Sequence, residues 1–568
     1  MPRTARLRFL LLSCAPACIT APAGADTLRG ALVKAYMTNP TLTGQRATLR
    51  ATDENVPIAR AAGLPTANLT GDYTEFVVTS ANSFVRLPRQ ASARVNVSVP
   101  LYQGGQVRNS VAAARTRVEA GRATLRGTEA DLFTNVVAAY MDVIRDEAIV
   151  GLNTQNIRVL NVNLQASRDR FQVGDLTRTD VAQSEARLAL ARAQLQSAEA
   201  QLISSRENYI RFVGTPAGTL DTPPTLPHLP GSPASAVTVA IYNNPLLIAA
   251  AMERDATRYD VGVARASRLP QISAVGGAGY TNYLGSVSTA DGSASSLPNV
   301  NKAVQGGLSL TLPLFQGGRP AAQVRQAEAL QSRAIENVTA TERNVIAQVR
   351  SAYAVWQSSE QVIQSSEIAV KANKLSLEGV RAENSVGTRT ILDILNAEQE
   401  LLNSQVTLVT ARRDAYVAGF ALLAAMGQAE ARDLGLDGGA LYDPVANYRR
   451  VHGKIWDFGD DGEPVAVATR TAQTPVQDAS VRRQLDPFSM RRLTETSPPQ
   501  QIRTRETVIG VNRKLLQPCF VSKCFLHFPR RPYFHNPSAA DITSKRLCCI
   551  TPREHDRPLL EDIMRCGQ

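Results

Sequence analysis

The side chains best suited to chemistry are unevenly placed in this 568-residue chain. Cysteine is absent from residues 26–500, and histidine occurs in that range only at His228 and His452. A thiolate metal site, a cysteine nucleophile and a histidine-based triad therefore cannot be assembled there. We predict that the body of the chain is not an enzyme and that it holds no cofactor or metal.

A cluster of potential metal ligands lies in the C-terminal tail, where Cys519-x4-Cys524 is followed by His527 and His535. This spacing fits no compact zinc template, and prolines interrupt it. Thiols of an exported chain would also be oxidised. We therefore expect no metal site in the tail.

Two aspartates recur in one local pattern, Thr177-x-x-Asp180 and Thr390-x-x-Asp393. A threonine followed three residues later by an acidic residue is typical of a capping box, in which the two side chains satisfy free amides at a helix start. Both aspartates are therefore predicted to begin helices. Any further chemistry depends on which elements surround them.

Two sets of glycines are predicted to shape the connections between elements. One set occurs in tight turns before the two Thr-x-x-Asp patterns, where a positive φ angle is needed. The other set allows a sharp passage from a strand into a helix. The turn glycines are Gly174 and Gly387, and the passage glycines are Gly104, Gly105, Gly317 and Gly318.

The body is internally duplicated. Residues 98–105, Ser-Val-Pro-Leu-Tyr-Gln-Gly-Gly, return as Thr-Leu-Pro-Leu-Phe-Gln-Gly-Gly at residues 311–318. Residues 171–174 return at 384–387 with the same offset, and an Asn-Pro pair at Asn39-Pro40 returns at Asn244-Pro245. Self-similarity over about 200 residues predicts two copies of one unit. We assign the first repeat to residues 26–230 and the second to residues 231–430.

Each copy is predicted to contain a β-hairpin and a long α-helical hairpin. Apolar and polar residues alternate, with the period of strands, at about 67–78, 91–102, 271–284 and 303–315. The remaining segments read as helices, and those that return from the Gly174 and Gly387 turns carry apolar residues at heptad spacing, as in a coiled coil. The predicted helices are about 27–63, 105–171 and 176–213 in the first copy, and 233–267, 319–384 and 389–427 in the second.

The two ends of the chain differ from its body. Basic and apolar residues followed by Ala-Gly-Ala predict a signal peptide at residues 1–25, with acylation of Cys14 as an alternative. Residues 431–500 are predicted to be a disordered periplasmic extension, because they are poor in apolar residues. Residues 501–568 form an atypical Cys/Arg-rich tail, predicted to be disordered and foreign to the fold.

The net charge of +12 belongs mainly to these ends. The tail holds twelve basic and six acidic residues, and the predicted signal peptide holds three arginines. The nearly neutral body gives no electrostatic reason to bind DNA or RNA. We expect no nucleic-acid partner.

Four strands per chain pose a closure problem. The smallest barrels need about eight strands, and an open sheet with an apolar face is prone to aggregate. Two chains would supply eight strands and three would supply twelve. We therefore expect the sheet to close by oligomerisation.

With these features, the chain resembles the TolC-type outer-membrane efflux proteins. The resemblance rests on the duplicated plan, the Pro-Leu-(Tyr/Phe)-Gln-Gly-Gly motifs and the Val-Gly-Thr-Arg-Thr-Ile-Leu-Asp sequence at residues 386–393. It implies an α+β membrane protein, a homotrimer with one 12-stranded β-barrel in outer-membrane lipid and a coiled-coil α-helical tunnel in the periplasm. Such proteins are passive exit ducts for drug efflux and type I secretion, working with an inner-membrane transporter and a periplasmic adaptor.

The resemblance also implies roles for residues near the hairpin tips. Asp393 matches the first of two aspartates that line the periplasmic entrance of the family, and Asn396 stands at the second position. Arg389 matches an arginine that helps to hold the entrance closed, whereas the tyrosine expected in that network is Asn384. A ring of three Asp393 carboxylates would repel one another, have raised pKa values and attract cations.

Plainer alternatives stand beside these roles. Asp393 and Asp180 could each be only a helix cap, and one residue could serve both purposes. Arg389 could be a solvated surface residue. Contact of an adaptor with the turns at Gly174 and Gly387 is likewise implied only by the resemblance.

A different class of function remains open, namely a structural or adhesive trimeric coiled-coil surface protein without transport. Such a protein normally carries one C-terminal group of strands after a long stalk. Here the hairpins lie inside each of two copies, which favours the duct.

Overall fold

The computed structural model describes residues 26–78, 85–227, 229–289, 298–436, 441–459 and 461–482. The predicted signal peptide with Cys14, His228, the end of the predicted extension and the whole Cys/Arg-rich tail lie outside the described residues. The predictions made for those segments stay predictions.

Six long elements follow one another in the first half of the body, and the same order returns in the second half. The first half contains α1 (Leu28–Thr38), α2 (Pro40–Ala61), β1 (Thr66–Glu75), β3 (Arg89–Gln103), α3 (Gln106–Gln172) and α4 (Arg178–Val213). The second half contains α5 (Pro233–Asn243), α6 (Pro245–Ala266), β4 (Gln271–Asn282), β6 (Val300–Thr311), α7 (Arg319–Ser385) and α8 (Ile391–Ala425). Two short strands, β2 (Val85–Arg86) and β5 (Ser288–Thr289), pair with each other.

The single helices predicted at residues 27–63 and 233–267 are each broken, so this prediction was wrong. The breaks lie at Asn39 and Asn244, whose backbones are extended with ψ angles of 127° and 121°. A following proline disfavours the helical conformation of the residue before it, and proline is itself well suited to the first position of a new helix. The asparagine side chain then caps that helix, Asn39 through the amide of Thr41.

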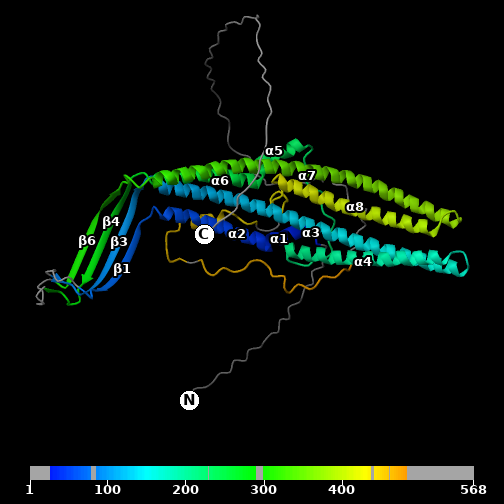
Figure 1. Ribbon diagram of the computed structural model, residues 1–568, viewed down its shortest axis with the longest axis horizontal. Coiled ribbons are helices and arrows are strands. Elements are labelled where there is room, and N and C mark those ends of the chain that lie inside the picture. The colour runs from blue at the N-terminus through cyan, green and yellow to red at the C-terminus, as the bar shows by residue number, and fades with distance from the viewer. Residues whose placement is uncertain are drawn as a thin grey trace, which may run out of the picture. The chain divides into compact units, whose positions relative to one another are not determined.

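The four long strands form one antiparallel sheet in the order β1-β3-β4-β6. The central pair joins the two halves of the chain, with Ala93 opposite Tyr280 and Val97 opposite Gly276. β1 and β6 are the two edges of this sheet. In Figure 1 the sheet lies at one end of the long helices. The turns that join α3 to α4 and α7 to α8 lie at the other end.

The last strand ends earlier than its predicted limit of residue 315. β6 stops at Thr311, and Pro313 follows closely. A proline has no amide hydrogen for a sheet hydrogen bond. The corresponding Pro100 stays inside β3, where the register with β4 shifts next to it.

The long helices form two hairpins, α3 with α4 and α7 with α8. The helices α3 and α7 each contain 67 residues, which corresponds to about 100 Å at 1.5 Å per residue. The main apolar core lies where α3, α4 and α8 meet α1, around Phe133, Tyr140, Tyr209 and Phe420. Smaller apolar clusters follow the helices towards the turns.

Among the helices of the described ranges, none alone is long and apolar enough to cross a membrane. The bent pair α5 and α6 together has the required length and composition.

The described part of the predicted extension is not detached from the body, so the expectation of disorder is wrong for residues 441–459 and 461–482. This segment contains a short helix, α9 (Ala446–Val451), which packs on α2. Asn447 donates a hydrogen bond of 2.8 Å to the buried Asp53 of α2. Arg206 of α4 binds the segment near its described end. Polar anchors thus hold the segment together with a few apolar contacts, made by Leu441, Tyr442 and Tyr448.

Candidate functional site at the helical hairpin tips

The two tip turns have the same backbone conformation. Gly174 and Gly387 both have a φ angle of 82°. After each glycine the chain returns an amide to the last turn of the preceding helix, from Asp175 to the Arg170 carbonyl and from Thr388 to the Glu383 carbonyl. This closure is typical of a glycine-ended helix. It brings the following helix back beside the first.

Both predicted capping boxes are present in the structure. One carboxylate oxygen of Asp180 accepts hydrogen bonds from the amide and hydroxyl of Thr177, at 2.9 and 2.7 Å. Asp393 makes the same two contacts with Thr390, at 3.0 and 2.8 Å. The threonine hydroxyls in turn accept from the aspartate amides at 3.3 Å. The first turns of α4 and α8 are therefore capped in the same way.

These contacts also set the charge of the two carboxyls within one chain. The hydrogen bond from the Thr177 hydroxyl and that from its amide hold the pKa of Asp180 below its usual value. The Thr390 side chain and amide do the same for the pKa of Asp393, with a smaller contribution from Arg389. Both aspartates are partly exposed anions at neutral pH.

Arg389 and Asn384 bind within their own turn. The Arg389 guanidinium donates to the Glu383 carboxylate at 2.7 Å, and the Asn384 amide donates to the Arg389 carbonyl at 2.7 Å. The structure does not bring Arg389 to Asp180, which bonds to Thr177 in the other hairpin. Arg389 is exposed and binds within its own turn in one chain, so the alternative of a solvated surface residue stays open.

Asn396, by contrast, does connect the two hairpins. Arg187 of α4 donates to the side-chain oxygen of Asn396 of α8 at 2.7 Å. An aspartate at this position would have offered the arginine a full charge. The asparagine retains the geometry with a weaker, neutral acceptor.

A second link was missed by sequence reasoning. Glu398 of α8 is only 6% exposed, and both of its carboxylate oxygens accept from the Asn163 amide of α3 at 2.9 Å. Arg381 of α7 also donates to this carboxylate, at 2.9 Å. Glu398 therefore joins three helices of both hairpins. Its signal in the sequence is a carboxylate in the apolar heptad track, seven residues after Ile391.

The strand-to-helix glycines lie at the opposite end of the helices. Gly105 and Gly318, both with φ of 80°, precede α3 and α7, and Gly104 and Gly317 before them have φ of 61° and 59°. A side chain at Gly104 would meet the Cβ atom of Leu269 at 2.8 Å. Nothing lies within 4 Å of the equivalent position at Gly317. Both passages use left-handed backbone, but only the first is tightly packed.

Within the described residues, no group of three or more His, Cys, Asp or Glu side chains is arranged to hold a metal ion.

Comparison with known proteins places this architecture in a family. The sequence profile of the outer membrane efflux protein family matches the chain twice, at residues 31–215 and 236–428. The outer membrane efflux protein BepC of Brucella suis is 34% identical over 429 residues, which are 76% of this chain and 91% of BepC. The outer membrane protein TolC of Vibrio cholerae is 27% identical, covering 76% of this chain and 97% of TolC.

A solved structure has the same fold. The outer membrane protein VceC of Vibrio cholerae aligns with a TM-score of 0.60 and 23% identity, over 70% of this chain and 96% of VceC. The chain therefore belongs to the outer membrane efflux protein family. It is located in the outer membrane and serves as an exit duct for efflux.

Proposed function

We propose that three copies of the chain form this duct, each adding its four strands to a single 12-stranded barrel in outer-membrane lipid. Support comes from the order and direction of the strands. With β1 and β6 at opposite edges of a four-stranded antiparallel sheet, β6 of one copy can pair antiparallel with β1 of the next. A head-to-tail contact of this kind generates a ring where the rotation between copies closes. A duplicated unit of β-hairpin and helical hairpin underlies the arrangement.

The helices of neighbouring copies would continue the barrel as a periplasmic tunnel. The exposed apolar residues of α7, called its seam below, support this proposal, because two pairs of them, each at heptad spacing, are left uncovered in one chain. Val355 and Val362 are 52% and 43% exposed, and Ile368 and Leu375 are 68% and 70% exposed. Apolar residues at this spacing are suited to packing against another helix.

We place the gate of the tunnel at the hairpin tips. Three Asp393 carboxylates, each held by its Thr390 cap, would form one acidic layer around the axis and favour cations. Asn396, Arg389 and Asp180 would surround this entrance. Glu398 would fasten the second hairpin of each copy to the first while the duct is closed.

Opening would follow contact with an inner-membrane transporter and a periplasmic adaptor, the latter docking at the turns of Gly174 and Gly387. The duct itself would be passive and not an enzyme. The gate proposal depends mainly on the paired capping geometry, which fixes a partly exposed carboxylate at the tip of each hairpin.

Planar-bilayer recordings test the duct. The purified protein is expected to conduct ions with a preference for cations, and Asp393→Ala should weaken that preference while Asp175→Ala, an exposed tip carboxylate, should not. A trimer that never conducts, with or without Asp393→Ala, would leave the structural or adhesive role as the better explanation. Native mass spectrometry in detergent measures the trimer separately.

The transported class of substrate is resolved in a deletion strain. Greater drug susceptibility with an unchanged set of secreted proteins indicates efflux of small molecules. Loss of a secreted polypeptide indicates type I secretion, and both changes together indicate a shared duct. Restoring the gene reverses either effect, whereas an unaltered strain contradicts both.

A further inference from the structure

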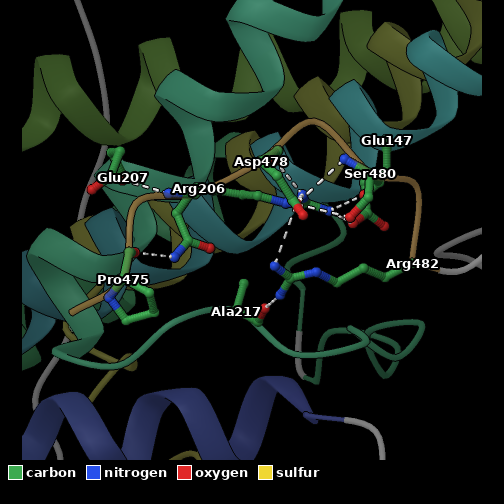
Figure 2. Close-up of polar contacts among 9 residues, drawn as sticks. Glu147, Arg206, Glu207, Ala217, Pro475, Asp478, Ser480 and Arg482 are labelled. Atoms are coloured by element: carbon green, nitrogen blue, oxygen red, sulfur yellow. Dashed lines mark hydrogen bonds and ion pairs between the residues drawn. The ribbon is translucent and has the colours of Figure 1, made fainter.

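The residue of interest is Arg206 of α4, whose side chain is completely buried. Burying a guanidinium carries a large desolvation penalty, which an ion pair and hydrogen bonds from its N–H groups must offset. Glu147 of α3, itself 2% exposed, forms an ion pair with it. The other acceptors of the Arg206 guanidinium come from a segment 272 residues later in the chain, at Asp478 and Ser480. Figure 2 shows how these groups converge on the guanidinium.

The segment presents backbone as well as side-chain oxygens to Arg206. The guanidinium donates to the carbonyls of Asp478 and Ser480, at 2.5 and 2.7 Å, and to the Asp478 carboxylate at 3.0 Å. The Asp478 carboxylate also accepts from the Ser480 amide and hydroxyl, at 3.3 and 2.8 Å, so the segment bends here. The bend directs both carbonyls and the carboxylate towards one guanidinium. The planar guanidinium is suited to this multiple recognition.

Further contacts hold the segment on either side of Arg206. The Gln477 amide donates to the Glu207 carboxylate at 3.3 Å, and the Gln477 side chain is 5% exposed. Arg482 donates to the carbonyl of Ala217, in the loop after α4. Figure 2 shows Glu207 to the left of the Arg206 contacts and Ala217 below them. The contacts thus extend over residues 477–482.

The attachment is nevertheless superficial. Of residues 475–482, Gln477 alone is buried, and the Asp478 side chain remains 66% exposed. All but two of the described residues between 452 and 474 are exposed as well. Regions with few buried contacts open locally at low cost, without unfolding of the whole protein. On release, water can replace the three acceptors while Glu147 keeps the ion pair with Arg206.

We propose that Arg206 and Glu147, with Glu207 and the Ala217 carbonyl, form a docking site for a polypeptide segment that presents an aspartate and its neighbouring carbonyls to Arg206. The chain's own residues 475–482 fill the site as a removable strap, with Arg206 as the recognition residue. The strap lies against α4, and its departure leaves a polypeptide-binding site on the α3–α4 hairpin.

The first test measures docking in the full-length protein by limited elastase digestion, which cleaves after the small residues Val476, Ala479 and Val481. Asp478→Arg places a positive charge against Arg206 and should release the strap. We expect about tenfold faster cleavage there, with unchanged cleavage of α3 and α4. Asp457→Arg, a charge reversal at an exposed position of the same segment, should match the original protein.

The second test asks whether the vacated site binds a peptide. A fluorescent peptide of residues 473–482 should bind full-length Asp478→Arg saturably, and should bind the double variant with Arg206→Met about tenfold less tightly. Equal binding to both variants, or strap cleavage unaffected by Asp478→Arg, would overturn the proposal. Neither measurement depends on whether the protein conducts ions.

Discussion

The helices α3 and α7 have the same length and follow the same glycine passage, yet they differ greatly in environment. Of 67 residues each, α3 buries 24 and α7 buries 8 in a single chain. α3 packs against α1, α2, α4, α6 and α8, whereas α7 packs mainly against α8, α6 and α5. Of these two helices, the first has thus become interior within the chain. The second has kept an open face, which assembly can cover.

The largest effect is expected when a charge is placed on that open face of α7. Leu375→Asp places a charge in the exposed apolar seam of α7 and should abolish the trimer, because burial of an unpaired carboxylate between helices is strongly unfavourable. Native mass spectrometry should find mainly single chains. Val476→Asp, at a 92% exposed position away from the seam, serves as control and should remain trimeric. A trimeric Leu375→Asp protein would contradict the proposed interface.

The next effect compares equivalent positions in the two copies. Phe133 of α3 is fully buried, whereas Ile346, 213 residues later in α7, is partly exposed. Phe133→Ala should destabilise the protein by about 3–5 kcal/mol. Ile346→Ala should cost distinctly less if α7 stays open on assembly.

Thermal unfolding in detergent, followed by circular dichroism, measures both variants. A loss at Ile346 as large as that at Phe133 would show that a neighbouring copy covers this part of α7 as completely as α3 is covered. In that case the contrast between the helices would exist only before assembly.

Sequence periodicity locates the long helices and strands well, since the apolar spacing reports directly on which face is covered. Periodicity fails where the backbone preference of one residue interrupts an element that the apolar pattern continues. The apolar pattern continues through Asn39-Pro40, so the break in the helix depends on proline geometry. Arg206 is equally hidden from pattern analysis, because its acceptors come from residues 478 and 480, far away along the chain.

The candidate site shows the same limit. The Thr-x-x-Asp boxes were predictable because all of their atoms lie within one turn of helix. Glu398 was missed because its partners, Asn163 and Arg381, belong to two other helices. The roles of Asp393, Asn396, Arg389 and Asp180 at an entrance remain proposals, since they depend on neighbouring copies.

A smaller effect is expected where the two hairpins of one chain meet. Glu398→Ala removes the acceptor shared by Asn163 and Arg381, and should increase conductance of the closed duct several-fold in planar bilayers. Glu400→Ala, an exposed carboxylate two residues later, is the matched control and should leave conductance unchanged. If both variants conduct like the original protein, the hairpins are held together elsewhere.

The smallest effect concerns the two capping boxes under acid. Since hydrogen bonds lower the folded pKa of Asp180, its cap stabilises α4 above the ordinary aspartate value of about 3.9 and is lost as pH falls through the lowered pKa. Asp393 in one chain follows the same direction. In a trimer, like charges around the axis would raise the pKa of Asp393, so that its cap is lost at a higher pH.

Hydrogen exchange at the first turns of α4 and α8, followed from pH 6 downwards, separates these cases. Exchange that rises first in α8 supports the carboxylate ring, and Asp393→Asn should remove this pH dependence. Simultaneous opening of both turns would indicate that the two tips remain equivalent and that Asp393 acts as a cap alone.

The pairing of β3 with β4 has a consequence for how the protein forms. These neighbouring strands are separated in the chain by the entire α3–α4 hairpin and by α5 and α6. Contacts between such distant residues form late, whereas helices and their hairpins depend on nearby residues. The helical hairpins should therefore fold first, and the sheet should be completed only after the second half has emerged. Until then β3 has an unpaired edge that must be kept from aggregating.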